Sequence, residues 1–214
     1  MSNTDSKADK NWKKSNVALD NYNNYINGKI ELEKKFDLTL IDLLYISNFK
    51  GGNATINEEE NFINAKLKAY SNVFINIHET FGNKNLSTLK ESEVHNLLRL
   101  IVEVIDLSKK RETGIDGFKS SYLSALLHSY FPNLIPILDR RLLINLGLVE
   151  KIEQLNNQKQ VKHIEDYYPD LIKTVQKKSI ELEKSVRELD EIYFKQELPN
   201  WVNRKIKKED FDTN

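Results

Sequence analysis

Residues 113–146 hold the side chains of this sequence whose types and spacing could do chemistry. Lys119 follows two closely spaced glycines, Gly114 and Gly117. Asp139 lies 20 residues beyond Lys119, after a turn that contains proline. A lysine amine becomes nucleophilic when burial lowers its pKa, and a carboxylate can stabilise positive charge that develops during a reaction. A second interpretation involves no chemistry: Lys119 is a solvated residue in a first helical turn, and Asp139 is a helix N-cap.

The two glycines predict a tight hairpin between two helices, because glycine alone adopts positive φ freely and allows another backbone to approach closely. The helix after the hairpin is expected from about Phe118 to Tyr130. Small side chains along it would let it pack closely against a neighbour; they are Ser120, Ser121, Ser124 and Ala125.

This arrangement resembles the helix-hairpin-helix glycosylase superfamily, the base-excision enzymes typified by endonuclease III and oxoguanine glycosylase. The resemblance implies an all-α domain of two packed helical lobes that binds DNA. It also implies that Lys119 attacks a sugar carbon as a Schiff-base nucleophile. Asp139 would then stabilise the oxocarbenium-like charge while the target base is flipped out of the duplex.

The sequence also departs from the superfamily pattern. The hairpin Gly114-Ile115-Asp116-Gly117 is one residue longer than the usual Gly-x-Gly, and Asp116 places a negative charge where phosphate would approach. A second resemblance is to uncharacterised bacterial helical proteins with a Ser-Lys/Ala-x-Leu-His-x-x-x-Pro-x-x-x-Pro-x-x-Asp stretch, here Ser124 to Asp139. Those proteins look like degenerate members of the same fold, often in mobile or phage-defence neighbourhoods.

Basic residues around the hairpin are the candidate phosphate ligands: Lys109, Lys110, Arg111, Arg140 and Arg141. They make residues 107–141 net positive, which would give salt-dependent binding of nucleic acid. Alternatively, Arg140 or Arg141 pairs internally with Glu or Asp on the last helix.

Phe49 lies in a loop with two adjacent glycines, Gly51 and Gly52. The loop could probe a DNA strand, with Phe49 as the wedge beside a flipped base. The other interpretation is a plain helix terminator whose glycines turn the chain.

His128 lacks the closely spaced carboxylates or histidines that a metal site needs, so a structural, hydrogen-bonded role is favoured over a metal ligand. No phosphate-cradling, nucleophile-elbow or zinc-protease motif occurs. We therefore expect no metal and no cofactor.

Composition bounds these hypotheses. The chain has 214 residues, of which 39% are hydrophobic and 30% charged, so it can bury a core. It has no cysteine, which excludes disulfides, iron–sulfur clusters and thiol catalysis. Its formal net charge is zero, so any nucleic-acid surface must be local. The polar start, without an apolar run, and the lack of any membrane-length apolar stretch predict a cytoplasmic protein without a membrane partner.

Helical spacing dominates the chain, and the sequence predicts an all-α fold. Residues 1–16 and 203–214 are expected to be disordered arms, and 17–202 one helical domain whose lobe core is about 57–146. The expected helices are about 38–46, one opening near Asn57, one after Thr88, 118–130, one from after Pro136 to Leu146, and a long one over 169–197.

Two functions follow from these observations. The first is DNA binding with base-excision glycosylase or abasic-lyase activity through Lys119 and Asp139. The second is a non-enzymatic helical interaction module, for example a component of a bacterial defence or mobile-element system, that binds a protein partner and keeps the scaffold without the chemistry.

Overall fold

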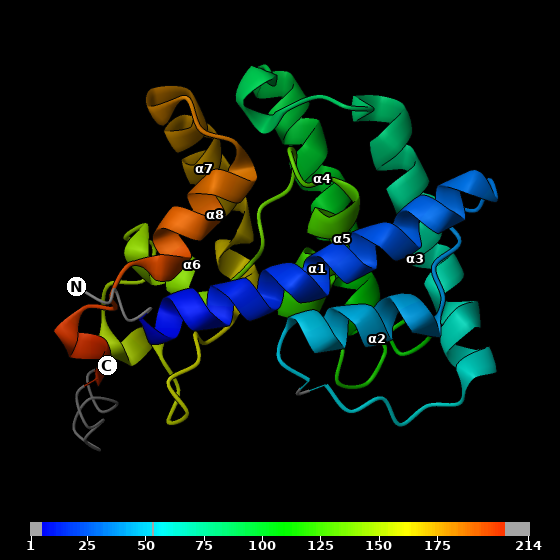
Figure 1. Ribbon diagram of the computed structural model, residues 1–214, viewed down its shortest axis with the longest axis horizontal. Coiled ribbons are helices and arrows are strands. Elements are labelled where there is room, and N and C mark those ends of the chain that lie inside the picture. The colour runs from blue at the N-terminus through cyan, green and yellow to red at the C-terminus, as the bar shows by residue number, and fades with distance from the viewer. Residues whose placement is uncertain (1–5, 53, 204–214) are drawn as a thin grey trace.

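The computed structural model describes residues 6–52 and 54–203, and this part of the chain is all-α, as the sequence predicts (Figure 1). Within it lie eight α-helices and no strand. None of these helices is long and apolar enough to span a bilayer. The helix bounds are α1 Lys7–Glu31, α2 Leu40–Phe49, α3 Glu60–Phe81, α4 Glu91–Lys109, α5 Ser120–Tyr130, α6 Arg140–Asn145, α7 Tyr168–Leu182 and α8 Val186–Lys195.

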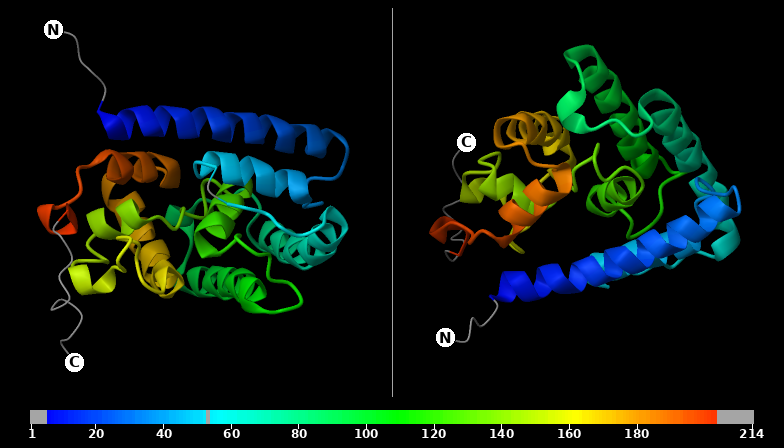
Figure 2. Two further views of the ribbon diagram at one scale, coloured as in Figure 1. Left: turned by 90° about the horizontal axis from the view of Figure 1, so that it is seen from below. Right: turned by 45° about the horizontal axis from the view of Figure 1, so that its top comes forward.

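The first helix overturns the expectation of a disordered arm for residues 7–16, because α1 begins at Lys7, and residues 1–5 of that arm lie outside the described residues. A capping box fixes its start: the Ser6 hydroxyl accepts the Asp9 N–H at 3.1 Å, and the Asp9 carboxylate accepts the Ser6 N–H at 3.2 Å. Trp12 and Ala18 are buried on one side of the helix. The lysines that made the segment look disordered lie on its solvated side. α1 crosses one face of the molecule, from α8 at one end to α2 and α3 at the other (Figures 1 and 2).

The central element is α5, where nearly every residue is buried. It contacts α1, α2 and α4. The small residues predicted on it do allow close approach: the Ser124 hydroxyl accepts the Leu138 N–H at 2.8 Å, and the Ser121 hydroxyl donates to the Leu138 carbonyl at 3.0 Å. These two bonds fix the segment that leads into α6 directly against α5.

The predicted long helix over 169–197 is instead two helices, α7 and α8. The chain turns at Glu183, whose φ of 53° is left-handed. Ser185 then caps α8 in a capping box with Glu188. The turn folds α8 back against α7, so that α8 also reaches α1 and α6. The C-terminal arm predicted over 203–214 lies outside the described residues except for Asn203, which ends a short 3₁₀ helix.

A buried ionic network joins α1, α2 and α5. Asp42, completely buried on α2, accepts hydrogen bonds from Tyr22 at 2.8 Å and from Tyr130 at 2.9 Å. Lys29 donates to both Asp42 oxygens at 3.1 Å and to Tyr130 at 3.0 Å. Burial lowers the pKa of Lys29 and raises the pKa of Tyr22 and Tyr130. Each polar group therefore depends on the others to offset its desolvation.

Removing the charge of Asp42 should destabilise the fold strongly. Asp42→Asn leaves the Lys29 ammonium buried without a counter-ion, so we expect a loss of about 3–5 kcal/mol in the free energy of unfolding. Urea denaturation of the variant measures this loss. The control is Asp106→Asn, an exposed aspartate of α4, which should stay within about 0.5 kcal/mol of wild type. A loss below about 1 kcal/mol for Asp42→Asn would show that the network is not essential.

Candidate functional site

Asp139 is the N-cap of α6, as the second interpretation of the sequence proposed. Its Oδ1 accepts the Arg141 N–H at 2.8 Å. Its Oδ2 lies 3.4 Å from the ammonium of Lys50, which caps the C-terminus of α2. Asp139 is nevertheless not buried within this cap, because its side chain is 25% exposed. Capping orients the carboxylate and leaves it accessible.

That accessible side faces a cleft of about 590 Å³, within the volume range of sites that hold small ligands. Four elements form its walls: the N-terminal half of α1, the end of α2 with its glycine loop, the start of α6, and α8. Asp139 and Lys50 line one side, and Asp190 and Phe194 of α8 line another. Two carboxylates from segments about 50 residues apart therefore share one cleft.

Asp190 is the more buried of the two carboxylates, with a side chain 4% exposed. Arg187, one helical turn earlier, donates to its Oδ2. The pKa of the Asp190 carboxyl is raised to about 7, chiefly by burial; Arg187 and Lys50 lower it and nearby Asp139 raises it within that value. Asp190 consequently titrates near neutral pH inside the cleft.

Trp12 of α1 lines the cleft where α1 packs against α8. The Arg187 guanidinium stacks over its indole at 4.0 Å, and the Phe194 ring centroid lies at 5.5 Å. The indole Nε1 is buried and has no hydrogen-bond partner. Buried donors are usually paired, so this unpaired N–H is an exception within the contact between α1 and α8.

Lys119 does not lie with Asp139 in this cleft. It is the N-cap residue of α5, is exposed, and is absent from the cleft lining. Lys119 therefore does not line the cleft that Asp139 lines, although Ser121, two residues later, contacts the Leu138 carbonyl next to Asp139.

The predicted glycine hairpin is present, and it packs against the protein's own chain. Gly117 has the expected positive φ, 76°, and a Cβ there would lie 2.6 Å from the Thr55 carbonyl oxygen. Gly114 has no positive φ but is equally confined, since a Cβ would lie 2.7 Å from the Lys110 carbonyl oxygen. The glycines are required for packing within the molecule.

A carboxylate of the protein also binds the hairpin backbone. The Asp116 N–H donates to Glu58 at 3.0 Å, and Lys66 pairs with Glu58 while donating to the Gly114 carbonyl at 2.8 Å. Glu58 therefore binds one backbone N–H of the hairpin, that of Asp116.

The basic residues around the hairpin are mostly engaged elsewhere. Arg140 donates to the Lys159 carbonyl, and Arg141 donates to the carbonyls of Phe194 and Gln196, each at 2.6 Å. Both arginines bind backbone carbonyls and not the acidic side chains of the last helix that the alternative predicted; their binding of phosphate stays a prediction.

Of the remaining hairpin cations, Lys109 lies 3.6 Å from Glu165. Lys110 and Arg111 are exposed.

Two further candidates are structural. Phe49 is the last residue of α2 and is only 8% exposed, so its ring cannot project as a wedge. The terminator interpretation of its loop fits, since Gly51 and Gly52 both have positive φ. His128 is fully buried, its Nδ1 lies 2.8 Å from the Ile135 carbonyl oxygen, and burial lowers its pKa to about 4. Among the described residues no group of three His, Asp or Glu side chains could hold a metal.

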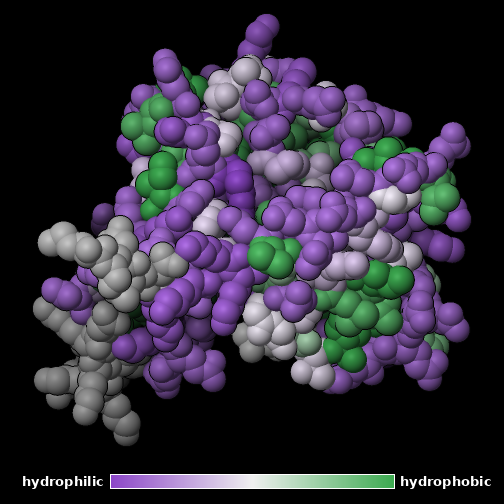
Figure 3. All heavy atoms as spheres, in the orientation of Figure 1, coloured by the Kyte–Doolittle hydropathy of each residue, from purple (hydrophilic) through white to green (hydrophobic). Residues whose placement is uncertain are grey.

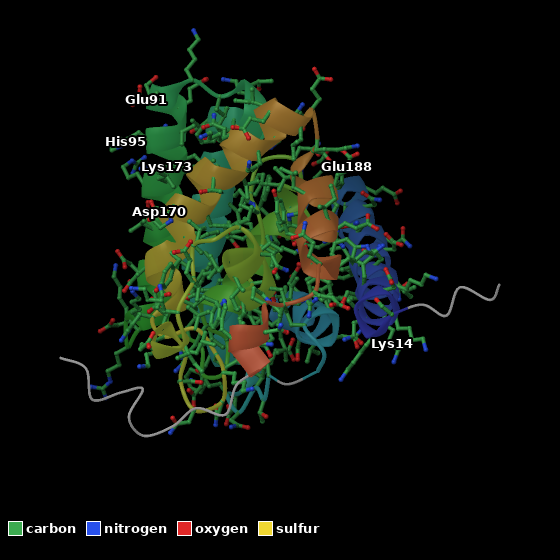
Figure 4. All side chains as sticks on the ribbon, turned by 90° about the vertical axis from the view of Figure 1, so that its left-hand side faces the viewer. Lys14, Glu91, His95, Asp170, Lys173 and Glu188 are labelled. Carbon is green, nitrogen blue, oxygen red and sulfur yellow. The ribbon has the colours of Figure 1, made fainter. Side chains whose placement is uncertain are left out.

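Sequence reasoning missed a basic surface at the mouth of the cleft. The N-terminal half of α1 carries exposed lysines on its solvated side; they are Lys7, Lys10, Lys13 and Lys14. Lys14 also lines the cleft. It projects from α1 on the side of the molecule opposite to Asp170 of α7 (Figure 4). The signal was present in the sequence, as lysines spaced three or four residues apart around Trp12.

No family model, no curated protein and no solved structure matches this chain. The assignment of function therefore depends on the geometry of the cleft.

The pKa of Asp190 makes stability depend on pH. Its folded pKa, about 7, lies above the unfolded value of about 3.9. Between these two pH values the folded state holds the Asp190 proton and the unfolded state does not. The free energy of unfolding that this proton contributes is therefore complete below about pH 4 and is lost as the pH rises through 7. The wild type should lose about 2 kcal/mol relative to Asp190→Asn between pH 5 and pH 8. Urea unfolding at each pH measures this difference. Asp170→Asn, exposed on α7, should track the wild type, and parallel curves for Asp190→Asn would refute the shift.

Proposed function

We propose that this protein binds DNA across the mouth of the cleft and hydrolyses the N-glycosidic bond of a base inserted there, with Asp139 as the essential carboxylate. The observation that carries the proposal is the position of Asp139: a fixed N-cap whose carboxylate faces a cleft of about 590 Å³. Lys119 has no part in the reaction, so the chemistry is hydrolytic and forms no Schiff base.

A helix-hairpin-helix glycosylase-like fold is part of this proposal. Its support is the order of elements: α4, the Gly114–Gly117 hairpin, α5, and then Asp139 at the start of α6. In that superfamily the corresponding aspartate faces the cleft that receives the base. Here Asp139 also faces a cleft, which favours the same use.

The cleft offers groups suited to this chemistry. Breaking an N-glycosidic bond develops positive charge on the sugar, and a carboxylate held in place by a cap and by Lys50 can stabilise that charge without reorganising. Trp12, Phe49 and Phe194 supply apolar wall for a planar base.

The DNA-binding surface of this proposal is α1 and not the hairpin. Exposed lysines line α1 beside the cleft mouth, whereas the hairpin N–H is bound by Glu58. Phosphates on α1 would bring a flipped base to Asp139 within the same cleft.

A second candidate is the non-enzymatic interaction module, which would bind a protein partner. It is favoured by the exposed position of Lys119 and by an apolar surface on α2. Ile41 and Leu44 there are 46% and 52% exposed, and hydrophobic side chains gather over this helix below the hydrophilic band of α1 (Figure 3). The two candidates differ in whether a base is released.

Base release should depend on Asp139 and not on Lys119. The wild type is incubated with labelled DNA carrying a panel of normal, deaminated, oxidised and methylated bases, and alkali then cleaves at abasic sites. Asp139→Asn should lower the rate at least about 10²-fold, because the developing positive charge loses its carboxylate. Lys119→Ala should retain the wild-type rate.

Asp170→Asn is the matched control for a lost carboxylate at a helix N-terminus. Borohydride should trap no covalent adduct with an abasic duplex. Release of no base from the whole panel would reject the glycosylase proposal and favour the interaction module. An adduct lost in Lys119→Ala would instead restore the lysine mechanism.

DNA affinity should depend on the lysines of α1. We expect the double variant Lys10→Ala/Lys14→Ala to weaken binding and to reduce the slope of log affinity against log salt by about 2. Fluorescence anisotropy with a labelled duplex at several salt concentrations measures both quantities. The comparison is Lys110→Ala/Arg111→Ala at the hairpin, which should leave the slope unchanged. The opposite result would place DNA on the hairpin.

A further inference from the structure

A second carboxylate, that of Asp190, lines the cleft, and the proposed role of Asp139 gives it no function. Asp190 lies on α8 and lines the same cavity as Asp139 and Lys50. A side chain that only paired with Arg187 could do so on the surface of α8, yet Asp190 is buried with its side chain 4% exposed. The buried indole of Trp12, which stacks on Arg187, lines the same cavity.

We propose that Asp190 is the proton donor of this cleft, which protonates the leaving base while Asp139 stabilises the sugar. This inference deepens the proposed glycosylase function and rests on it. It also specifies the substrate class: a neutral base that leaves poorly unless it receives a proton.

The proposed step balances without a cofactor. The bond between the sugar C1′ and the base nitrogen breaks, and its electron pair stays with the base, which takes the proton of the Asp190 carboxyl. Water then adds to C1′, and the proton that water loses returns to the Asp190 carboxylate. The products are the free base and an abasic sugar, and no oxidant, reductant or metal is consumed.

The surroundings of Asp190 suit a donor. Arg187 on α8 donates to Oδ2, so a proton on this carboxyl would sit on Oδ1. Lys50 from the end of α2 and Asp139 from the start of α6 act on it with opposite signs.

Three further titratable groups interact electrostatically with Arg187, the partner of Asp190. They are Asp20 of α1, Glu191 of α8 and His128 of α5. Because burial lowers the pKa of His128 to about 4, His128 is neutral at the working pH. Burial keeps the proton on Asp190 up to about pH 7, the range in which a general acid is most effective.

The test compares two leaving bases in Asp190→Asn. One is the neutral base of the panel that the wild type releases fastest. The other is 7-methylguanine, which is already cationic and needs no proton to leave. We expect the rate of base release to fall at least about 10²-fold for the neutral base and less than tenfold for 7-methylguanine.

The pH dependence of the rate is a second readout. The wild-type rate on the neutral base should fall as pH rises through about 7, and the rate of the variant should not show this fall. Asp139→Asn should lose both activities, and circular dichroism confirms that each variant is folded.

Infrared spectroscopy supplies a readout that is independent of activity. A protonated carboxyl band that titrates near pH 7 in the wild type should be missing in Asp190→Asn and retained in Asp170→Asn.

Three outcomes overturn the proposal. Equal losses on the two bases would make Asp190 structural. If base release depends on Asp139 but no carboxyl band titrates near pH 7, Asp190 is not the proton donor, and the glycosylase function is still supported. Titration without release of any base would refute both.

Discussion

The arrangement of this protein depends on one buried carboxylate. Asp42 accepts hydrogen bonds from Tyr22 and Lys29 of α1 and from Tyr130 of α5, while itself belonging to α2. The consecutive helices α1 and α2 are thereby fixed to α5, whose Tyr130 lies 88 positions beyond Asp42, at a buried point. Because α1 is rigid and continuous, anchoring its C-terminal half at Asp42 also directs its N-terminal half over α8. Trp12 then packs against Arg187 and closes the cleft.

Local signals predicted much of the fold and part of the site. Amphipathic spacing predicted the all-α class and most of the central helices. Asp139 caps α6, because an aspartate before a helical run accepts its free N–H groups whatever the rest of the fold does. The need for glycine at position 117 was also predictable, since its φ is positive.

Other features depended on contacts that no local pattern contains. Lys50 and Asp139 meet across 89 positions, and Arg141 reaches the carbonyl of Phe194 across 53. Residues 7–16 looked like part of a disordered arm because their composition is polar, and Trp12 is the aromatic side chain that α1 buries there. The break between α7 and α8 had a local signal, the capping box that Ser185 opens, but the apolar stripe runs through it and concealed it. The site therefore emerged only when α1 and α8 were placed.

The central claim is that the Asp139 carboxylate stabilises a cationic sugar in this cleft. The most direct measurement is the affinity for two duplexes that differ in one nucleotide, one with a protonated pyrrolidine ring in place of the sugar and one with a neutral tetrahydrofuran. The account predicts that the wild type binds the cationic duplex at least about 10²-fold more tightly, and that Asp139→Asn binds the two equally. Equal affinities in the wild type, or a preference that survives Asp139→Asn, would contradict it.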